Sequence, residues 1–261
     1  MSKLLSLAAA VGLIKDGDTV ALGGNTIQRS PAAFAREMAR RKKRNIELVK
    51  TAGAYDVDLL ALAGCLSAVH AGYIGFENMG LAPNYRKAVE GGQTQAKEHA
   101  CYTVIAGLRA AAYGIPFMPV AGFLGSELLE VRDFKLVKDP FTGQEVVAVQ
   151  KLQPDWAVIH VHEADVEGNG RILGSQFEDA LMTRAAKGVI LTAERIVDKS
   201  QFQKHPESVA IPGFLVNAVV ELPGGAAPGS CYPLYDANIE AIRSYLAMAP
   251  EALEDYLKEV R

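Results

Sequence analysis

Short apolar strand patterns alternate with helix patterns along most of this 261-residue chain, and this alternation limits the possible folds more than any other feature. Strand patterns at 19–22, 46–51 and 67–73 each precede a helix pattern. Strands that are joined through helices run parallel, and the helices cover both faces of the sheet. The first half of the chain therefore predicts an open, mostly parallel α/β sheet with helices on both faces.

The second half of the chain adds an antiparallel signal. Strand patterns at 134–137 and 145–150 flank a turn that contains Pro140 and Gly143, which is typical of a hairpin. The remaining predicted elements are strands at 156–161 and 189–192 and helices at 177–187, 237–248 and 250–260. Because no internal repeat or linker interrupts this order, we expect a single domain over residues 1–261 with a small antiparallel extension.

The composition excludes several classes of partner. The formal net charge of −3 provides no general attraction to nucleic acid or to anionic membranes, and no segment approaches the roughly 20 apolar residues of a membrane-spanning helix. Cys65, Cys101 and Cys231 are widely spaced, which favours a reducing compartment and a cytoplasmic location. The basic run at 40–44 is interpreted as a solvated helix end.

Ligands of open parallel sheets bind at the carboxyl ends of the strands, so the loops that follow the strands are candidate sites. After the first strand, Gly23, Gly24 and Asn25 lead towards a helix that Ser30 is expected to cap, with Pro31 in its first turn. Adjacent glycines allow close approach to the backbone, and a helix N-terminus favours an anionic oxygen. A plain tight turn is the alternative, because the loop matches neither the dinucleotide fingerprint nor the P-loop.

Two further loops follow predicted strands, at 75–84 and at 122–126. Glu77 places a carboxylate in the first of them, although the solvated polarity of an ordinary loop explains it equally well. The candidate substrate-binding residues of these loops are Phe76, Asn78, Gly125 and Ser126. The apolar side chains that could line a pocket there are Phe76, Met79, Tyr85, Phe123 and Leu124.

Glu98 is a second candidate carboxylate. It precedes an alanine-rich and leucine-rich helix pattern at 99–113, where the helix dipole alone favours a glutamate. In a partly buried position the same side chain could act as a nucleophile or a general base. His160 and His162 lie on one face of a strand, but no third metal ligand follows at a suggestive spacing, which favours hydrogen-bonded histidines over a metal site.

A series of segments spread over nearly the whole chain matches one known family. They are 14–24, 75–84, 110–119, Gly125 with Ser126, Ala164 with Asp165, Gly168 with Asn169, and 194–197. In this order they make the chain resemble the A (alpha) subunit of family I coenzyme A transferases, and most of all the glutaconate CoA-transferase branch.

The resemblance implies a homologous B (beta) subunit as partner, in assemblies such as heterotetramers. It implies an enzyme that moves CoA between an acyl-CoA and a small carboxylic acid through a glutamyl-CoA intermediate, without a metal or another cofactor. The nucleophilic glutamate of such transferases lies on the B subunit, in a Ser-Glu-Asn-Gly-like motif. Residues 77–80 are a degenerate form of this motif, which makes Glu77 a candidate catalytic residue.

Two other functions remain open. Some two-subunit proteins of similar fold are hydrolases that open the ring of a steroid-derived CoA ester, and their catalytic glutamate matches Glu98 of this chain. A non-catalytic protein that binds CoA esters is the third possibility. The transferase hypothesis predicts the catalytic glutamate on the partner subunit, whereas the hydrolase hypothesis predicts it at Glu98.

Overall fold

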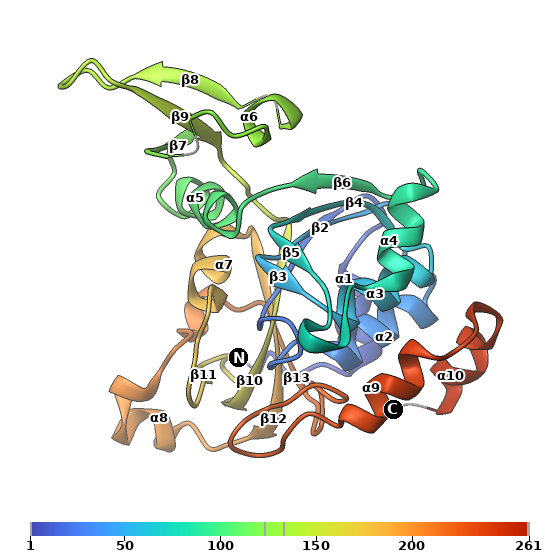
Figure 1. The fold of residues 1–261 in the computed structure, drawn as a ribbon. Helices are drawn as coiled ribbons and strands as arrows, with labels where there is room; N and C mark the ends of the chain where they lie inside the picture. Colours follow the sequence, from blue (N-terminus) through green and yellow to red (C-terminus); the bar gives the residue numbers. More distant parts are fainter. Residues whose placement is uncertain (1, 123, 133, 260–261) are drawn as a thin grey trace.

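The computed structural model describes residues 2–122, 124–132 and 134–259, and an eight-stranded sheet lies at its centre (Figure 1). Seven strands run parallel in the order β13-β12-β10-β1-β2-β4-β6, and the short β11 pairs antiparallel with β10. Their bounds are β1 Thr19–Leu22, β2 Ile46–Val49, β4 Leu66–Ala71, β6 Gln95–Glu98, β10 Trp156–Ala164, β11 Gly170–Arg171, β12 Gly188–Ile196 and β13 Ala218–Glu221. The chain builds outwards from β1 to β6 and then returns to β10, so the direction of winding switches between β1 and β10.

Helices cover both faces of this sheet, as the alternation of strand and helix patterns predicts. On one face lie α1 (Leu7–Leu13), α2 (Ala32–Arg40) and α3 (Tyr55–Leu62), and on the other α5 (Cys101–Ala112) and α7 (Asp179–Ala185). Successive strand side chains point to opposite faces. Accordingly Val20 and Leu22 pack with Phe34, whereas Ala21 packs on the side of Val104 and Met182.

A second, antiparallel sheet projects beyond α5 (Figure 1). Its strands are β7 (Phe117–Val120), β8 (Lys135–Lys138) and β9 (Glu145–Gln150), in the order β7-β9-β8. The predicted hairpin is therefore confirmed. The predicted strand before the loop at 122–126 was expected to end at the ligand-binding edge of the parallel sheet. This expectation is wrong, because in the described part of the chain β7 pairs with β9 of the antiparallel sheet.

The remaining helices and strands lie around these two sheets. They are β3 (Ala52–Gly53), β5 (Tyr73–Ile74), α4 (Pro83–Glu90), α6 (Leu128–Val131), α8 (Ser200–Lys204), α9 (Ile239–Leu246), α10 (Leu253–Glu259) and the 3-10 turns Glu77–Met79, Pro206–Ser208, Gly213–Leu215 and Pro250–Ala252. β6 was not predicted, since its sequence Gln-Ala-Lys-Glu is polar, as suits a strand at the edge of a sheet. In the described part of the chain, no helix has both the length and the apolar character needed to cross a bilayer.

Two buried ion pairs hold the loop between β1 and α2. Lys50 Nζ lies 2.5 Å from Asp56 Oδ2, with both side chains fully buried, and also donates to the Gly23 carbonyl at 2.8 Å. On the other side of the loop, Arg29 pairs with Asp179, whose second oxygen accepts the Gly24 N–H at 2.8 Å. The loop is thus tied both to the segment after β2 and to the start of α7.

The same contacts correct the expected start of α2. Ser30 makes no capping hydrogen bond; its hydroxyl donates to the Thr26 carbonyl at 3.1 Å and accepts from Lys50 Nζ at 2.8 Å. Pro31 occupies the position before the first helical residue instead. The Ser30 hydroxyl accepts from Lys50 and does not cap the helix, because an unpaired buried charge costs far more free energy than an uncapped N–H group.

Removing one partner of the Lys50–Asp56 pair should strongly destabilise the fold. Asp56→Ala leaves a fully buried ammonium group, and we expect it to lower the free energy of unfolding by about 3–5 kcal/mol in urea denaturation. Asp255→Ala is the matched control, since it breaks an exposed pair with Lys258 and should change stability far less than Asp56→Ala does. Equal losses in the two variants would contradict the role of the buried pair.

Candidate active site

The backbone N–H groups of the glycine loop after β1 donate hydrogen bonds to other parts of the protein. The N–H groups of Gly23, Gly24 and Asn25 donate to Val158 O at 2.9 Å, to Asp179 Oδ1 at 2.8 Å and to Gln28 O at 2.9 Å. A Cβ atom added at Gly24 would lie 2.5 Å from backbone atoms. The loop is therefore the plain tight turn of the two alternatives, and these three N–H groups do not face an anionic ligand.

The loop nevertheless reaches the second candidate loop through one hydrogen bond. Thr26 Oγ1 donates to Glu77 Oε1 at 2.5 Å, and the Glu77 N–H donates to the hydroxyl of Tyr73 at 3.2 Å. Thr26 and Glu77 both have left-handed backbones, with φ of 45° and 55°. Such conformations are uncommon for residues other than glycine and gather at functional sites. The structure thus brings the predicted loops together at Glu77.

The residues on either side of Glu77 differ in exposure. Asn78 is exposed beside it, as a substrate contact requires. Phe76 is fully buried and packs in a core cluster with Tyr245, so the prediction that it contacts substrate does not hold for this side chain. Burial of the large apolar side chain of Phe76 is favourable, whereas the polar Glu77 and Asn78 are exposed.

Glu98 lies in a cavity and not at the start of a helix. It is the last residue of β6, and α5 begins only at Cys101, so the helix-dipole explanation of this glutamate is wrong. Glu98, Tyr73 and Tyr85 line a cavity of about 460 Å³. Burial, together with the charge of Glu98, raises the pKa of the Tyr85 hydroxyl to about 12. Tyr73 is thus near both candidate glutamates: it lines the cavity of Glu98, and its hydroxyl accepts from the Glu77 backbone N–H.

Gly125 and Ser126 are exposed in the segment that leads to α6, and their loop approaches this cavity through Leu128. The Ser126 hydroxyl accepts the Leu128 N–H at 3.3 Å. Leu124 is exposed, and Phe123, another expected pocket residue, lies outside the described residues. Of this segment, Leu128 lines the cavity of Glu98, although the preceding strand β7 belongs to the other sheet.

A buried histidine that the sequence did not single out adjoins Glu98. The Thr103 hydroxyl donates to the Ala100 carbonyl, so it accepts from His99 Nδ1 at 2.9 Å. His99 Nε2 is thereby left as the acceptor for Arg132 and for His70 Nδ1, at 3.2 and 3.1 Å. Burial, followed by the charges of Arg132 and His70, lowers the pKa of His99 to about 3. In the sequence, the feature that could have singled out His99 is that it directly follows the candidate Glu98.

His160 and His162 are hydrogen-bonded within the protein, as the sequence favours. His160 contacts Thr192 Oγ1 at 2.8 Å and Glu194 Oε1 at 2.7 Å, and His162 Nε2 lies 2.7 Å from the Tyr232 carbonyl. Burial alone would raise the pKa of Glu194, but hydrogen bonds from His160, Tyr235 and the Gly224 N–H outweigh burial and lower it.

Among the described residues, His160 belongs to a group of possible metal ligands. His160, Glu194 and Cys231 have ligand atoms within 4.8 Å of one another. The carboxylate of Glu194 also accepts from Tyr235 at 2.6 Å and from the Gly224 N–H at 2.8 Å. These bonds tie the loop after β13 to β10 and β12, which accounts for the cluster without a metal.

The pKa of His99 predicts a pH-dependent stability. Below the ordinary histidine pKa of 6.5 the unfolded chain binds a proton that folded His99 does not take up until about pH 3. The protein should therefore lose about 2 kcal/mol of unfolding free energy, relative to His99→Gln, between pH 7 and pH 5. Urea denaturation of both proteins at several pH values measures this difference. A constant difference would contradict the neutral, buried His99.

Comparisons with known proteins agree on one family. The family model described as coenzyme A transferase matches residues 4–222. The A subunit of glutaconate CoA-transferase from Acidaminococcus fermentans is 32% identical over 99% of this chain and 88% of its own length. The A subunit of 3-oxoadipate CoA-transferase from Pseudomonas knackmussii is 36% identical over 91% of this chain and 85% of its own. The crystal structure of the Acidaminococcus glutaconate CoA-transferase superposes with a TM-score of 0.93, over 99% of this chain and 88% of that one.

Two further relatives limit what the match implies. An uncharacterised Archaeoglobus fulgidus protein is 36% identical over 98% of this chain, which spans only 59% of that protein's length. A cholesterol ring-cleaving hydrolase subunit from Mycobacterium tuberculosis is 29% identical over 95% of this chain and 88% of its own length. The same fold therefore occurs in relatives named for different reactions.

Proposed function

This chain belongs to the coenzyme A transferase family, and we propose that it is the A subunit of a two-subunit CoA-transferase. With a homologous B subunit it would move CoA from an acyl-CoA to a small carboxylic acid. We also propose a cytoplasmic location, because its free cysteines suit a reducing compartment.

The observation that carries this proposal is the hydrogen bond between Thr26 and Glu77. It joins the loops after β1 and β5, where ligands of parallel sheets bind, and Asn78 is exposed next to Glu77. The backbone N–H groups of Gly23, Gly24 and Asn25 are already used within the protein and cannot stabilise an oxyanion. A second chain that supplies donors and a nucleophile completes such a site.

The chemistry proceeds through two acyl transfers at one glutamate. A glutamate carboxylate attacks the thioester carbonyl, forms a mixed anhydride and releases the CoA thiolate. The thiolate then attacks the glutamyl carbonyl, which frees the first acid and leaves a glutamyl-CoA thioester. The acceptor acid takes CoA from this thioester by the reverse sequence. We propose that this glutamate belongs to the B subunit and that Glu77 and Glu98 line the site from this chain.

A hydrolase that cleaves a carbon–carbon bond of a CoA ester is the second candidate. The position of Glu98 favours it, because this carboxylate lines a cavity beside Tyr73 and Tyr85 and next to the neutral His99. In that reaction Glu98 would act as the general base on this chain.

Trapping the intermediate distinguishes these candidates. The chain is co-expressed with the subunit encoded beside it, incubated with an acyl-CoA, and examined by mass spectrometry for a glutamyl-CoA adduct. We expect the adduct on the partner subunit. Turnover without an adduct or an acceptor acid would instead support the hydrolase. A lone chain that binds CoA esters without turnover would support a binding protein.

Substitution of Glu98 gives an independent measure of its role. In a transferase, Glu98→Gln should reduce turnover by less than about 10²-fold and leave the adduct in place, whereas in a hydrolase it removes the general base and about 10²–10⁴-fold of the rate. Glu90→Gln is the matched control, because Glu90 lines the same cavity but pairs with Arg86 at its exposed side. Similar losses in both variants would assign neither glutamate a catalytic role.

The proposed reaction uses no metal and no cofactor other than the CoA of its substrate. Dialysis of the two-subunit enzyme against a strong chelator should therefore leave the rate of CoA transfer unchanged. A loss of activity that Zn²⁺ restores would contradict this proposal and would point to the His160, Glu194 and Cys231 group.

A further inference from the structure

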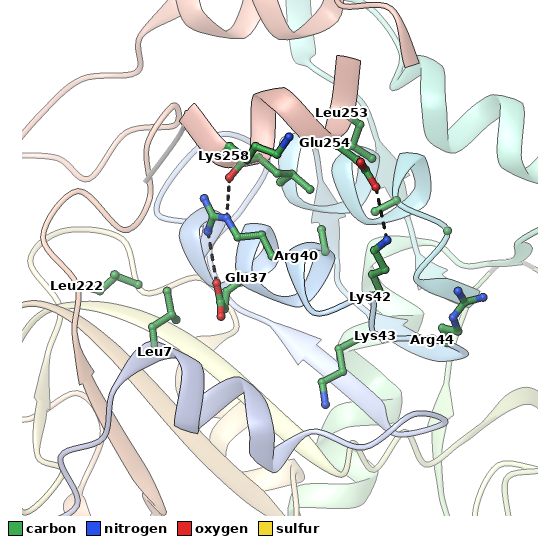
Figure 2. A pocket seen from close by; sticks show the side chains of 14 residues that line it. Leu7, Glu37, Arg40, Lys42, Lys43, Arg44, Leu222, Leu253, Glu254 and Lys258 are labelled. Carbon is green, nitrogen blue, oxygen red and sulfur yellow. Dashed lines mark hydrogen bonds and ion pairs between the residues drawn. The ribbon is translucent and has the colours of Figure 1, made fainter. Parts of the chain in front are cut away.

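A second, larger cavity lies apart from the candidate active site. It has a volume of about 920 Å³ and shares no lining residue with the cavity of Glu98. Figure 2 shows it between α1, the end of α2 and the C-terminal helix α10. The residues at 42–44 precede β2, so this part of the wall lies towards the amino ends of the strands, away from Glu77.

The wall of this cavity combines an apolar floor with a basic rim. The apolar lining residues are Leu7, Ala39, Ala63, Leu222, Leu253 and Leu257. The cationic lining residues are Arg40, Lys42, Lys43, Arg44 and Lys258, against the two acids Glu37 and Glu254. The basic run at 40–44 was expected to be a solvated helix end, and α2 does end at Arg40, with Arg41, Lys42 and Arg44 exposed. Four of the five members of this run also line the cavity.

The cations differ in how firmly the protein holds them. Arg40 Nε donates to the Leu257 carbonyl at 2.7 Å, and Lys43 donates to the Ile14 carbonyl, so both belong to the wall itself. Lys42 lies 3.5 Å from Glu254, with side chains that are 73% and 76% exposed. Exposed pairs of this kind contribute at most about 1 kcal/mol, so a ligand anion can replace Glu254.

We propose that this cavity binds an amphipathic organic anion, with its apolar body on the leucine floor and its carboxylate or phosphate head at Lys42 and Arg44. A volume near the upper end of common ligand pockets accommodates an acyl chain together with its head group. The ligand needs both its apolar body and its anionic head group. A bare anion makes no favourable contact with the leucines, and an uncharged chain forms no ion pair with Lys42 or Arg44. A ligand in this position bridges α2 and α10.

The binding test uses probes that separate charge from chain. Isothermal titration calorimetry of the full-length chain compares octanoate and octyl phosphate with 1-octanol and inorganic phosphate. We expect the two anionic amphiphiles to bind at one site per chain, more weakly at high salt, and at least 10-fold more tightly than either partial probe. The tighter of the two identifies a carboxylate or a phosphate as the preferred head group.

Variants locate the site without disturbing the candidate active site. The double variant Lys42→Glu with Arg44→Glu should weaken binding of both amphiphiles at least 10-fold, and Leu253→Ser should weaken them relative to inorganic phosphate. Lys204→Glu is the matched control, since this exposed lysine of α8 lies outside the cavity. Circular dichroism and thermal melting confirm that each variant is folded.

Three outcomes would overturn the proposal. Absence of binding by both amphiphiles would do so, as would inorganic phosphate that binds as tightly as octyl phosphate, which indicates a simple charged surface. Unchanged binding in the Lys42 and Arg44 double variant would place the ligand elsewhere. None of these outcomes bears on CoA transfer, because the cavity shares no residue with the cavity of Glu98.

Discussion

The rest of the site depends on the buried charges that flank the loop after β1. Lys50 pairs with Asp56 on one side and Arg29 with Asp179 on the other, and each pair also binds the backbone of Gly23 or Gly24. Charges in such a position are stable only while their partners and hydrogen bonds stay in place. These contacts restrain the loop, and Thr26, which follows it, donates to Glu77.

This rigidity also explains why the site resembles half of an enzyme. The backbone N–H groups of Gly23, Gly24 and Asn25 already donate to Val158, Asp179 and Gln28, so they are not available to a developing oxyanion. What the chain does present after its strands is two glutamates, Glu77 and Glu98, both of them near Tyr73. Acyl transfer needs a carboxylate nucleophile together with donors, so a homologous partner that contributes donors fits the arrangement.

Much of the fold followed from periodicity, and the exceptions have physical causes. The central strands β1, β2 and β10 read as apolar runs because both faces of a parallel sheet are buried. β6 was not predicted because an edge strand can be polar. The start of α2 differs from the prediction because the Ser30 hydroxyl accepts from Lys50 and does not cap the helix. The single-domain prediction for residues 1–261 and the roles of Glu77 and Glu98 stay predictions.

The sequence by itself determined the α/β layout, the candidate loops and the family, since all three depend on the order of local patterns along the chain. Only the tertiary structure decided which candidates are available to a ligand. Gly24 and Phe76 lie in promising loops, yet the first donates to Asp179, 155 residues away, and the second packs on Tyr245. Hydrogen-bond partners and burial come from residues distant in sequence, and no local pattern contains them.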